Sequence, residues 1–148
     1  KAFAGCGGYI AGEKALVEHL KYAAPGFVYS VGIAPAMAAA SLEAIRIMIV
    51  EPERVAGLRD RAGYFLEQAG KMSIDTGLSQ GYAVIPVIIG SSLKSTKLSQ
   101  FLFEQGINVQ PIIHPAVEER AARLRFFISC SHTRAQIDTT LSSVRNKI

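Results

Sequence analysis

Apolar residues recur at intervals of three and four positions in several stretches of the chain, which is the spacing of one helical face. The pattern predicts helices over 13–23, 52–69 and 95–105, and a last helix that begins at Thr133. Residues 35–50, PAMAAASLEAIRIMIV, are small or apolar almost throughout. Because such a helix is apolar on most of its surface, it should be buried against other structure on several sides.

Local signals mark the ends of these helices. Thr133 is followed three residues later by Gln136, which is the spacing of a capping box. Pro52 suits the first position of a helix, and Gly70 is the predicted C-terminal stop of that helix.

Strict alternation predicts a strand with one buried face in RLRFFIS, residues 123–129. Its apolar positions are Leu124, Phe126 and Ile128, and the opposite face carries Arg123, Arg125, Phe127 and Ser129. YAVIPVIIG is a second β-rich run, in which Pro86 predicts an edge position or a bulge. INVQPIIHPAV is predicted to be extended, and Tyr9–Ala11 is predicted to form a short strand.

Three regions follow from this order of elements. Residues 75–148 are predicted to form a compact βαββα layer of an α/β fold, and residues 51–74 a connecting helix. Residues 1–50 have the character of the end of a larger domain, because the apolar helix at 35–50 has no visible partner in the rest of the chain.

Composition narrows the classes of function. The 148 residues suffice for one domain or slightly less than one enzyme subunit, and 49% are hydrophobic, which supports a sizeable core. The net charge is +4 and the basic residues are scattered, so a nucleic-acid-binding surface is disfavoured. No apolar run is long enough to span a membrane, the start does not resemble a signal peptide, and the expected location is cytoplasmic. The cysteine and histidine spacings indicate neither a disulfide framework nor a metal site.

The chain opens on KAFAGCGGYIAG, a lysine followed by four glycines, and three interpretations compete. A dinucleotide-binding loop is disfavoured because Ile10 occupies the position of its third glycine, and a phosphate loop because the lysine precedes the glycines. The glycines could simply permit a tight turn beside a solvated lysine. Alternatively, Lys1 could form a Schiff base with pyridoxal phosphate (PLP), and the glycines would then allow the cofactor to approach closely.

Four segments, in order, resemble the α-oxoamine synthase family of PLP-dependent enzymes. The opening resembles the segment that begins at the family's cofactor-binding lysine, with matches at Lys1, Ala2, Gly7, Gly8 and Gly12. GFVYSVGIAPAMAAAS is similar to a family segment that precedes a helix of small residues. GINVQPIIHPAV and ARLRFFISCSHTRAQID are similar to two segments of the family's C-terminal region.

The resemblance implies fold type I of the PLP-dependent transferases. Residues 1–50 would then be the end of the large PLP-binding domain with its interdomain helix, residues 51–74 the connecting helix, and residues 75–148 the C-terminal small α/β domain. The resemblance also implies a homodimer with its active site at the subunit interface. The chain would be a C-terminal fragment, expected to be inactive alone because the family's ring-stacking histidine and ring-bonding aspartate lie upstream.

The resemblance assigns roles to three residues. Lys1 would hold PLP as an imine and act as the acid and base at the substrate α-carbon. Ser30 would present a hydroxyl to the cofactor phosphate, although Val31 and Gly32 stand where many relatives have further hydroxyls. Arg125 would bind the carboxylate of the amino acid, for which a guanidinium on a rigid strand is well suited.

Other residues near these segments have less defined roles. Arg123 lies on the same strand face as Arg125 and could share its site or merely flank it. His114 could line the pocket for the acyl chain, or it could be an ordinary half-exposed loop histidine. His132 is expected to bond the backbone near the start of the last helix, and His19 to be exposed on its helix.

The implied reaction condenses an amino acid with an acyl thioester, on coenzyme A or an acyl carrier, and releases carbon dioxide and the thiol to give an α-aminoketone. Two alternatives stay open. The protein could be a fold-type-I relative that performs transamination or aldol cleavage. It could also be a catalytically inactive fragment that binds a partner through the apolar helix at 35–50.

Overall fold

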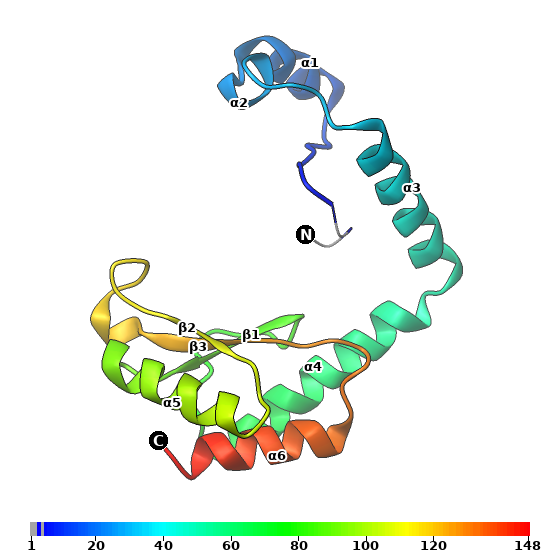
Figure 1. The fold of residues 1–148 in the computed structure, drawn as a ribbon. Helices are drawn as coiled ribbons and strands as arrows, with labels where there is room; N and C mark the ends of the chain where they lie inside the picture. The colour runs from blue at the N-terminus through cyan, green and yellow to red at the C-terminus, as the bar shows by residue number, and fades with distance from the viewer. Residues whose placement is uncertain (1–2, 4) are drawn as a thin grey trace. The chain divides into compact units, whose positions relative to one another are not determined.

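The computed structural model describes residue 3 and residues 5–148, and these divide into two compact units. The first unit extends to Pro52, and the second unit covers Glu53–Ile148. Figure 1 shows the order of their elements along the chain. Within the described residues, no helix has both the length and the apolar content needed to cross a membrane.

The first unit contains three helices and no sheet among its described residues. They are α1 (Lys14–Ala23), α2 (Pro25–Val28) and α3 (Pro35–Val50). The bounds of α3 are those predicted, with a proline in the first turn, where its fixed φ suits a helix. No residue of these helices is buried, and Ile49 and Val50 at the end of α3 are 70% and 72% exposed. Most of the apolar surface of α3 therefore stays exposed within the described residues of this unit.

One prediction for the first unit was wrong. Tyr9–Ala11 is irregular rather than a strand. A strand needs the hydrogen-bonding groups of a neighbouring strand, and the described part of the first unit supplies none. Helix α1 ends at Ala23, and Pro25 then opens the short helix α2.

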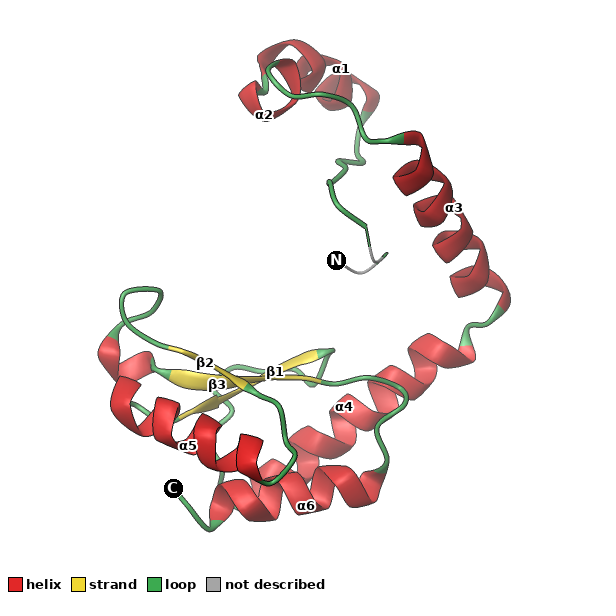
Figure 2. Cartoon of the chain, in the orientation of Figure 1, coloured by secondary structure: helices red, strands yellow, loops and turns green. Residues whose placement is uncertain are grey.

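The second unit is a three-stranded antiparallel sheet covered on one face by three helices (Figure 2). Its helices are α4 (Glu53–Lys71), α5 (Ser92–Glu104) and α6 (Arg134–Arg145). Its strands are β1 (Val84–Ile88), β2 (Gln110–Ile112) and β3 (Arg123–Phe127), in the spatial order β1-β3-β2. A single 3-10 turn, η1 (Glu119–Ala121), precedes β3. The order β1, α5, β2, β3, α6 is the predicted βαββα layer.

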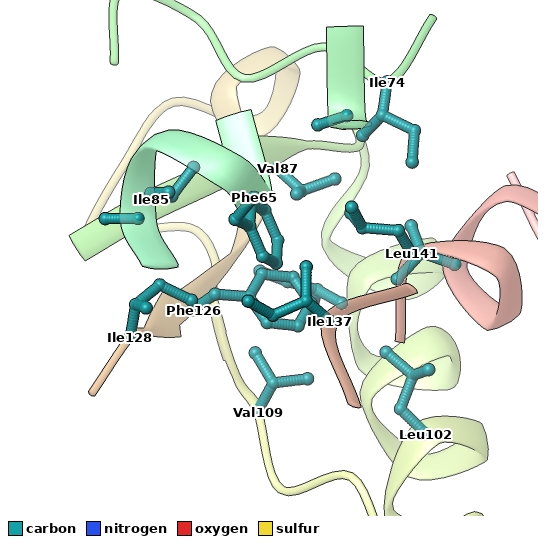
Figure 3. Packing of buried hydrophobic residues seen from close by; sticks show 14 of the residues in the cluster. Phe65, Ile74, Ile85, Val87, Leu102, Val109, Phe126, Ile128, Ile137 and Leu141 are labelled. Atoms are coloured by element: carbon teal, nitrogen blue, oxygen red, sulfur yellow. The ribbon is translucent and has the colours of Figure 1, made fainter. Parts of the chain in front are cut away.

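The core of the second unit lies between the sheet and its helices (Figure 3). Phe65 of α4 is 1% exposed, and its ring lies 5.2 Å from that of Phe126 on β3. Leu124 of β3, Leu102 of α5 and Leu141 of α6 are fully buried around them. The alternation of RLRFFIS therefore placed the correct side chains of β3 in the core.

The capping box predicted at the start of α6 is confirmed. The Thr133 hydroxyl accepts a hydrogen bond from the Gln136 backbone at 3.2 Å, and the Gln136 side chain accepts one from the Thr133 backbone at 2.9 Å. The stop predicted at Gly70 was wrong, because α4 continues to Lys71. The helix ends instead in a Schellman motif, in which Ile74 donates to the Ala69 carbonyl and Ser73, at φ 54°, donates to that of Gly70.

Strand β1 forms one edge of the sheet, as Pro86 predicted. Ile128 donates to the Ala83 carbonyl at 2.7 Å, so residues 83, 85 and 87 direct their hydrogen-bonding groups toward β3. Residues 84, 86 and 88 direct theirs away from the sheet. Two of these outward positions, 86 and 88, offer no free backbone N–H. Pro86 has none, and the N–H of Ile88 donates to the Asp75 carbonyl at 2.8 Å.

Candidate functional site

The open face of the sheet carries the residue to which the family resemblance assigns carboxylate binding. Arg125 lies in the middle of β3, opposite Pro86 of β1 and Gln110 of β2. Its side chain is exposed, whereas Leu124 and Phe126 on either side of it are buried in the core. A paired central strand thus holds the Arg125 backbone rigidly and directs its side chain away from the helices.

The Arg125 guanidinium lies next to an aromatic ring. Its central carbon, Cζ, is 5.4 Å from the ring centroid of Phe127, which is within the range of a cation–π contact. Among the residues that the structure describes, Arg125 forms no ion pair and no side-chain hydrogen bond. The guanidinium N–H groups of Arg125 are therefore available to an external anion.

Arg123 shares the open face but is engaged differently. It is half-buried between Ile88 and Ile112 on the neighbouring strands, and its Nε donates to the Ala121 carbonyl at 2.7 Å. This hydrogen bond ties the Arg123 side chain to its own turn. Of the two arginines on this face, Arg123 therefore has an Nε donor that is already engaged.

His114 is exposed in the loop after β2, and its peptide bond to Pro115 is cis. Its backbone N–H donates to the Ser92 hydroxyl at 3.3 Å. No hydrogen bond or ion pair of the described residues joins His114 to Arg125. The structure thus gives His114 the surroundings of an ordinary exposed loop histidine, and its role in an acyl pocket stays a prediction.

The carboxylate of Glu119 caps α5 from outside the helix, and the sequence gave no sign of this contact. It accepts hydrogen bonds from the Ser92 backbone N–H at 2.7 Å and from the Ser92 hydroxyl. These hydrogen bonds hold the pKa of Glu119 below its ordinary value. The loop that follows β2 is thereby fixed to the start of α5.

His132 bonds the backbone of the loop that leads from β3 into α6. Its Nδ1 accepts a hydrogen bond from the Ser129 N–H at 3.1 Å. Its carbonyl accepts one from Arg61 Nε of α4 at 2.9 Å. His132 therefore connects the end of β3 to α4 and has a structural role.

The contact between α4 and α6 was not predicted. The Tyr64 hydroxyl donates to Asp138 at 2.8 Å, and this hydrogen bond raises the pKa of Tyr64. The Arg134 guanidinium lies over the Tyr64 ring, 4.8 Å from its centroid, and pairs with Asp60 at 3.3 Å. In both pairs, Tyr64 with Asp138 and Asp60 with Arg134, the two residues lie 74 positions apart in sequence. No local pattern could therefore have revealed these contacts.

The two cofactor residues proposed from the sequence belong to the first unit. Ser30 is exposed just after α2, and its hydroxyl donates to the Val31 carbonyl at 3.4 Å, a long hydrogen bond. Lys1 lies outside the described residues. Gly7, between the two, has φ +114°, a conformation that favours glycine. His19 is exposed on α1, as expected.

A hollow of about 580 Å³ lies elsewhere in the second unit. Its lining includes Phe65, Asn108, Phe126 and Phe127, and neither Arg125 nor His114. Arg125 and His114 therefore lie outside the lining of this hollow. Across the described part of the chain, no three His, Cys, Asp or Glu side chains gather in a group that could hold a metal ion.

Comparisons with known proteins agree on one family. The family model "Aminotransferase class I and II" matches residues 1–144. The 8-amino-7-oxononanoate synthase of Thermosipho melanesiensis is 43% identical over 141 residues, which cover 95% of this chain and 36% of that protein. The chain thus spans little more than a third of the length of this curated relative.

Two solved structures show the fold. The crystal structure of 8-amino-7-oxononanoate synthase from Francisella tularensis has a TM-score of 0.82 and 22% identity, over 99% of this chain and 42% of that one. A high-resolution structure of SPT with the PLP internal aldimine has a TM-score of 0.84 and 21% identity, over 99% of this chain and 37% of that one. The predicted fold class, the end of a fold-type-I large domain followed by a small α/β domain, is confirmed.

Proposed function

Because the chain belongs to the aminotransferase class I and II family, we propose that it is the C-terminal part of a PLP-dependent acyltransferase. The complete enzyme condenses an amino acid with an acyl thioester on coenzyme A or an acyl carrier. Carbon dioxide and the thiol are released, and the product is an α-aminoketone. The observation that supports this proposal best is the 43% identity to an 8-amino-7-oxononanoate synthase over nearly the whole chain.

The residues of the first unit fit PLP as a cofactor. Ser30 offers an exposed hydroxyl that is held only by a long hydrogen bond, so it can turn to donate to a phosphate group. Val31 and Gly32 offer no side-chain donors, so among these three positions Ser30 supplies the hydroxyl. Lys1 would hold the cofactor through its side-chain nitrogen. PLP, when bound, supplies the electron sink that makes an amino-acid α-carbon reactive.

Each of the chain's own groups has a defined task in the proposal. The Lys1 amine, when free, takes or gives the proton at the substrate α-carbon, for which it must be neutral and therefore shielded from water. Arg125 binds the substrate carboxylate through two parallel N–H groups, and the paired strand β3 fixes the origin of its side chain. His114 is the proposed contact to the acyl group.

The assembly in the proposal is a homodimer of the longer polypeptide, with its active site at the subunit interface. The exposed apolar residues of α3 support a need for further protein, since a helix of this composition is stable in water only when it is covered. The upstream part of the polypeptide and the second subunit are the proposed sources of that cover. The proposed location is cytoplasmic.

The test uses the polypeptide encoded by the complete gene, reconstituted with PLP, and its Lys1→Ala variant. Thiol release from a series of acyl-coenzyme A thioesters is measured with glycine, L-alanine or L-serine. We expect amino-acid-dependent release in the wild type and loss of that release in the variant. Before amino acid is added, the wild type should show the visible absorption band of PLP joined to Lys1, and the variant should lack that band. Thiol release without dependence on the amino acid, or an unchanged Lys1→Ala variant, would contradict the proposal.

The same preparation separates the alternatives. Transfer of the amino group to a 2-oxo acid, without thiol release, would indicate an aminotransferase. Cleavage of a β-hydroxy amino acid to an aldehyde would indicate an aldolase. A protein that binds no PLP and associates through α3 would indicate an inactive partner-binding subunit.

A further inference from the structure

We propose that Phe127 is a positioning residue, which orients the Arg125 guanidinium for a substrate carboxylate without occupying its N–H groups. The inference rests on the proposed function, because it takes Arg125 as the carboxylate-binding group. The proposed function gives Phe127 no role, and this inference assigns it one.

The two side chains are placed together by the strand itself. Arg125 and Phe127 are two residues apart on β3, so both project from the open face of the sheet. The Arg125 Cζ lies 5.4 Å from the Phe127 ring centroid. Phe127 is 61% exposed, so burial in the core does not explain its presence on this face.

The neighbouring strand supports the ring. Val84 of β1 lies directly opposite Phe127 and is itself 41% exposed. Directly opposed residues of an antiparallel pair contact each other, and aromatic and β-branched side chains form favourable pairs. Val84 therefore limits the positions that the Phe127 ring can adopt, and the ring in turn limits those of Arg125.

The type of contact matters for the chemistry. A guanidinium has five N–H donors in one plane, and a carboxylate uses two of them side by side. Arg123 shows the alternative, because its Nε is consumed by the Ala121 carbonyl at 2.7 Å. An aromatic ring attracts the cation through its face and accepts no conventional hydrogen bond. Phe127 can thus order Arg125 and leave every donor free for the substrate.

The expected effect is small but measurable. A cation–π contact at an exposed site corresponds to about a two- to fivefold change in an equilibrium constant. Loss of the ring lets the Arg125 side chain sample more rotamers before it binds, so the affinity for the amino acid falls by that factor. Affinity for the acyl thioester does not depend on this ordering and stays unchanged.

The experiment compares Phe127→Leu, Phe127→Tyr and Phe103→Leu in the complete PLP-loaded enzyme. Phe103 on α5 is also 61% exposed, so its variant controls for the loss of an exposed ring. We expect Phe127→Leu to raise the KM for the amino acid about two- to fivefold, with the KM for the acyl thioester unchanged. The Phe127→Tyr variant keeps a π face and should behave as the wild type, as should Phe103→Leu. Equal midpoints of urea unfolding show that the folds are comparable.

Three results would overturn the inference. The first is an unchanged KM for the amino acid in Phe127→Leu, the second is failure of Phe127→Tyr to restore it, and the third is an equal rise in both KM values. An Arg125→Ala variant separates this failure from that of the premise. If Arg125→Ala raises the KM for the amino acid and Phe127→Leu does not, only the role of Phe127 is refuted. If Arg125→Ala has no effect, the proposed carboxylate site is refuted as well.

Discussion

The aromatic pair beneath the site lends itself to a quantitative prediction. Phe65 of α4 and Phe126 of β3 are 1% and 6% exposed, with ring centroids 5.2 Å apart and ring planes inclined by 44°. Phe126 lies between Arg125 and Phe127 on the strand. The pair therefore anchors the strand that carries the open-face residues onto α4.

Replacement by leucine isolates the interaction between the rings. Truncation of a buried phenylalanine to alanine costs about 3–5 kcal/mol, most of it from the cavity that is left. Leucine retains much of the volume, so each single variant is expected to lose less than that. The inclined arrangement of the rings adds about 0.5–1.5 kcal/mol beyond their buried area. This contribution is already absent from either single variant.

The assay is urea unfolding of the full chain, followed by circular dichroism, for Phe65→Leu, Phe126→Leu and the double variant. We expect a coupling energy of about 0.5–1.5 kcal/mol at an unchanged m-value. Phe65→Leu combined with Phe103→Leu is the control and should be additive. Additivity of Phe65→Leu and Phe126→Leu within about 0.3 kcal/mol would refute the reasoning, since the rings would then contribute through buried area alone.

Four further changes have expected outcomes, each measured by the urea midpoint of the full chain. Thr133→Ala removes the cap of α6 and should cost about 0.5–2 kcal/mol. Ser73→Gly should stabilise the chain by up to about 1 kcal/mol, because glycine adopts φ 54° without strain. Gly81→Ala should destabilise it, because φ is +72° and the new Cβ would lie 3.3 Å from a side-chain carbon of Leu66. Because hydrogen bonds from Ser92 lower the folded pKa of Glu119, this carboxylate stabilises the fold above its ordinary pKa of 4.5 and loses that effect as pH falls through the lower folded value. Glu119→Gln should therefore show a smaller loss of stability on acidification than the wild type.

The sequence predicted the second unit well because its signals are local. The alternation around Arg125 follows from the two-residue period of a strand, and the Thr133 cap from a three-residue spacing. Pro86 located the sheet edge because proline lacks the amide that an interior position requires. Each of these signals depends on chemistry within a few residues, so neighbouring structure did not override it.

The wrong predictions concern segments whose structure depends on residues far away in the sequence or on a partner strand that is missing. Tyr9–Ala11 has the composition of a strand, but its described unit supplies no partner strand. Gly70 suits a helix end, but the contact of Ala69 and Ile74 in the core extends α4 past it. Ser92 and Glu119 are 27 residues apart, so no local period reveals their hydrogen bonds. The position of Arg125 was predictable, whereas its aromatic neighbour required the coordinates.

The outer edge of β1 has a consequence for the behaviour of the protein in concentrated solution. An exposed strand edge invites a strand from another molecule, and such pairing can repeat into fibrils. Here Pro86 cannot donate, and the Ile88 amide is already taken by Asp75. An incoming strand would meet two missing donors in succession, so the sheet should resist growth by polymerisation from this side even while α3 is uncovered.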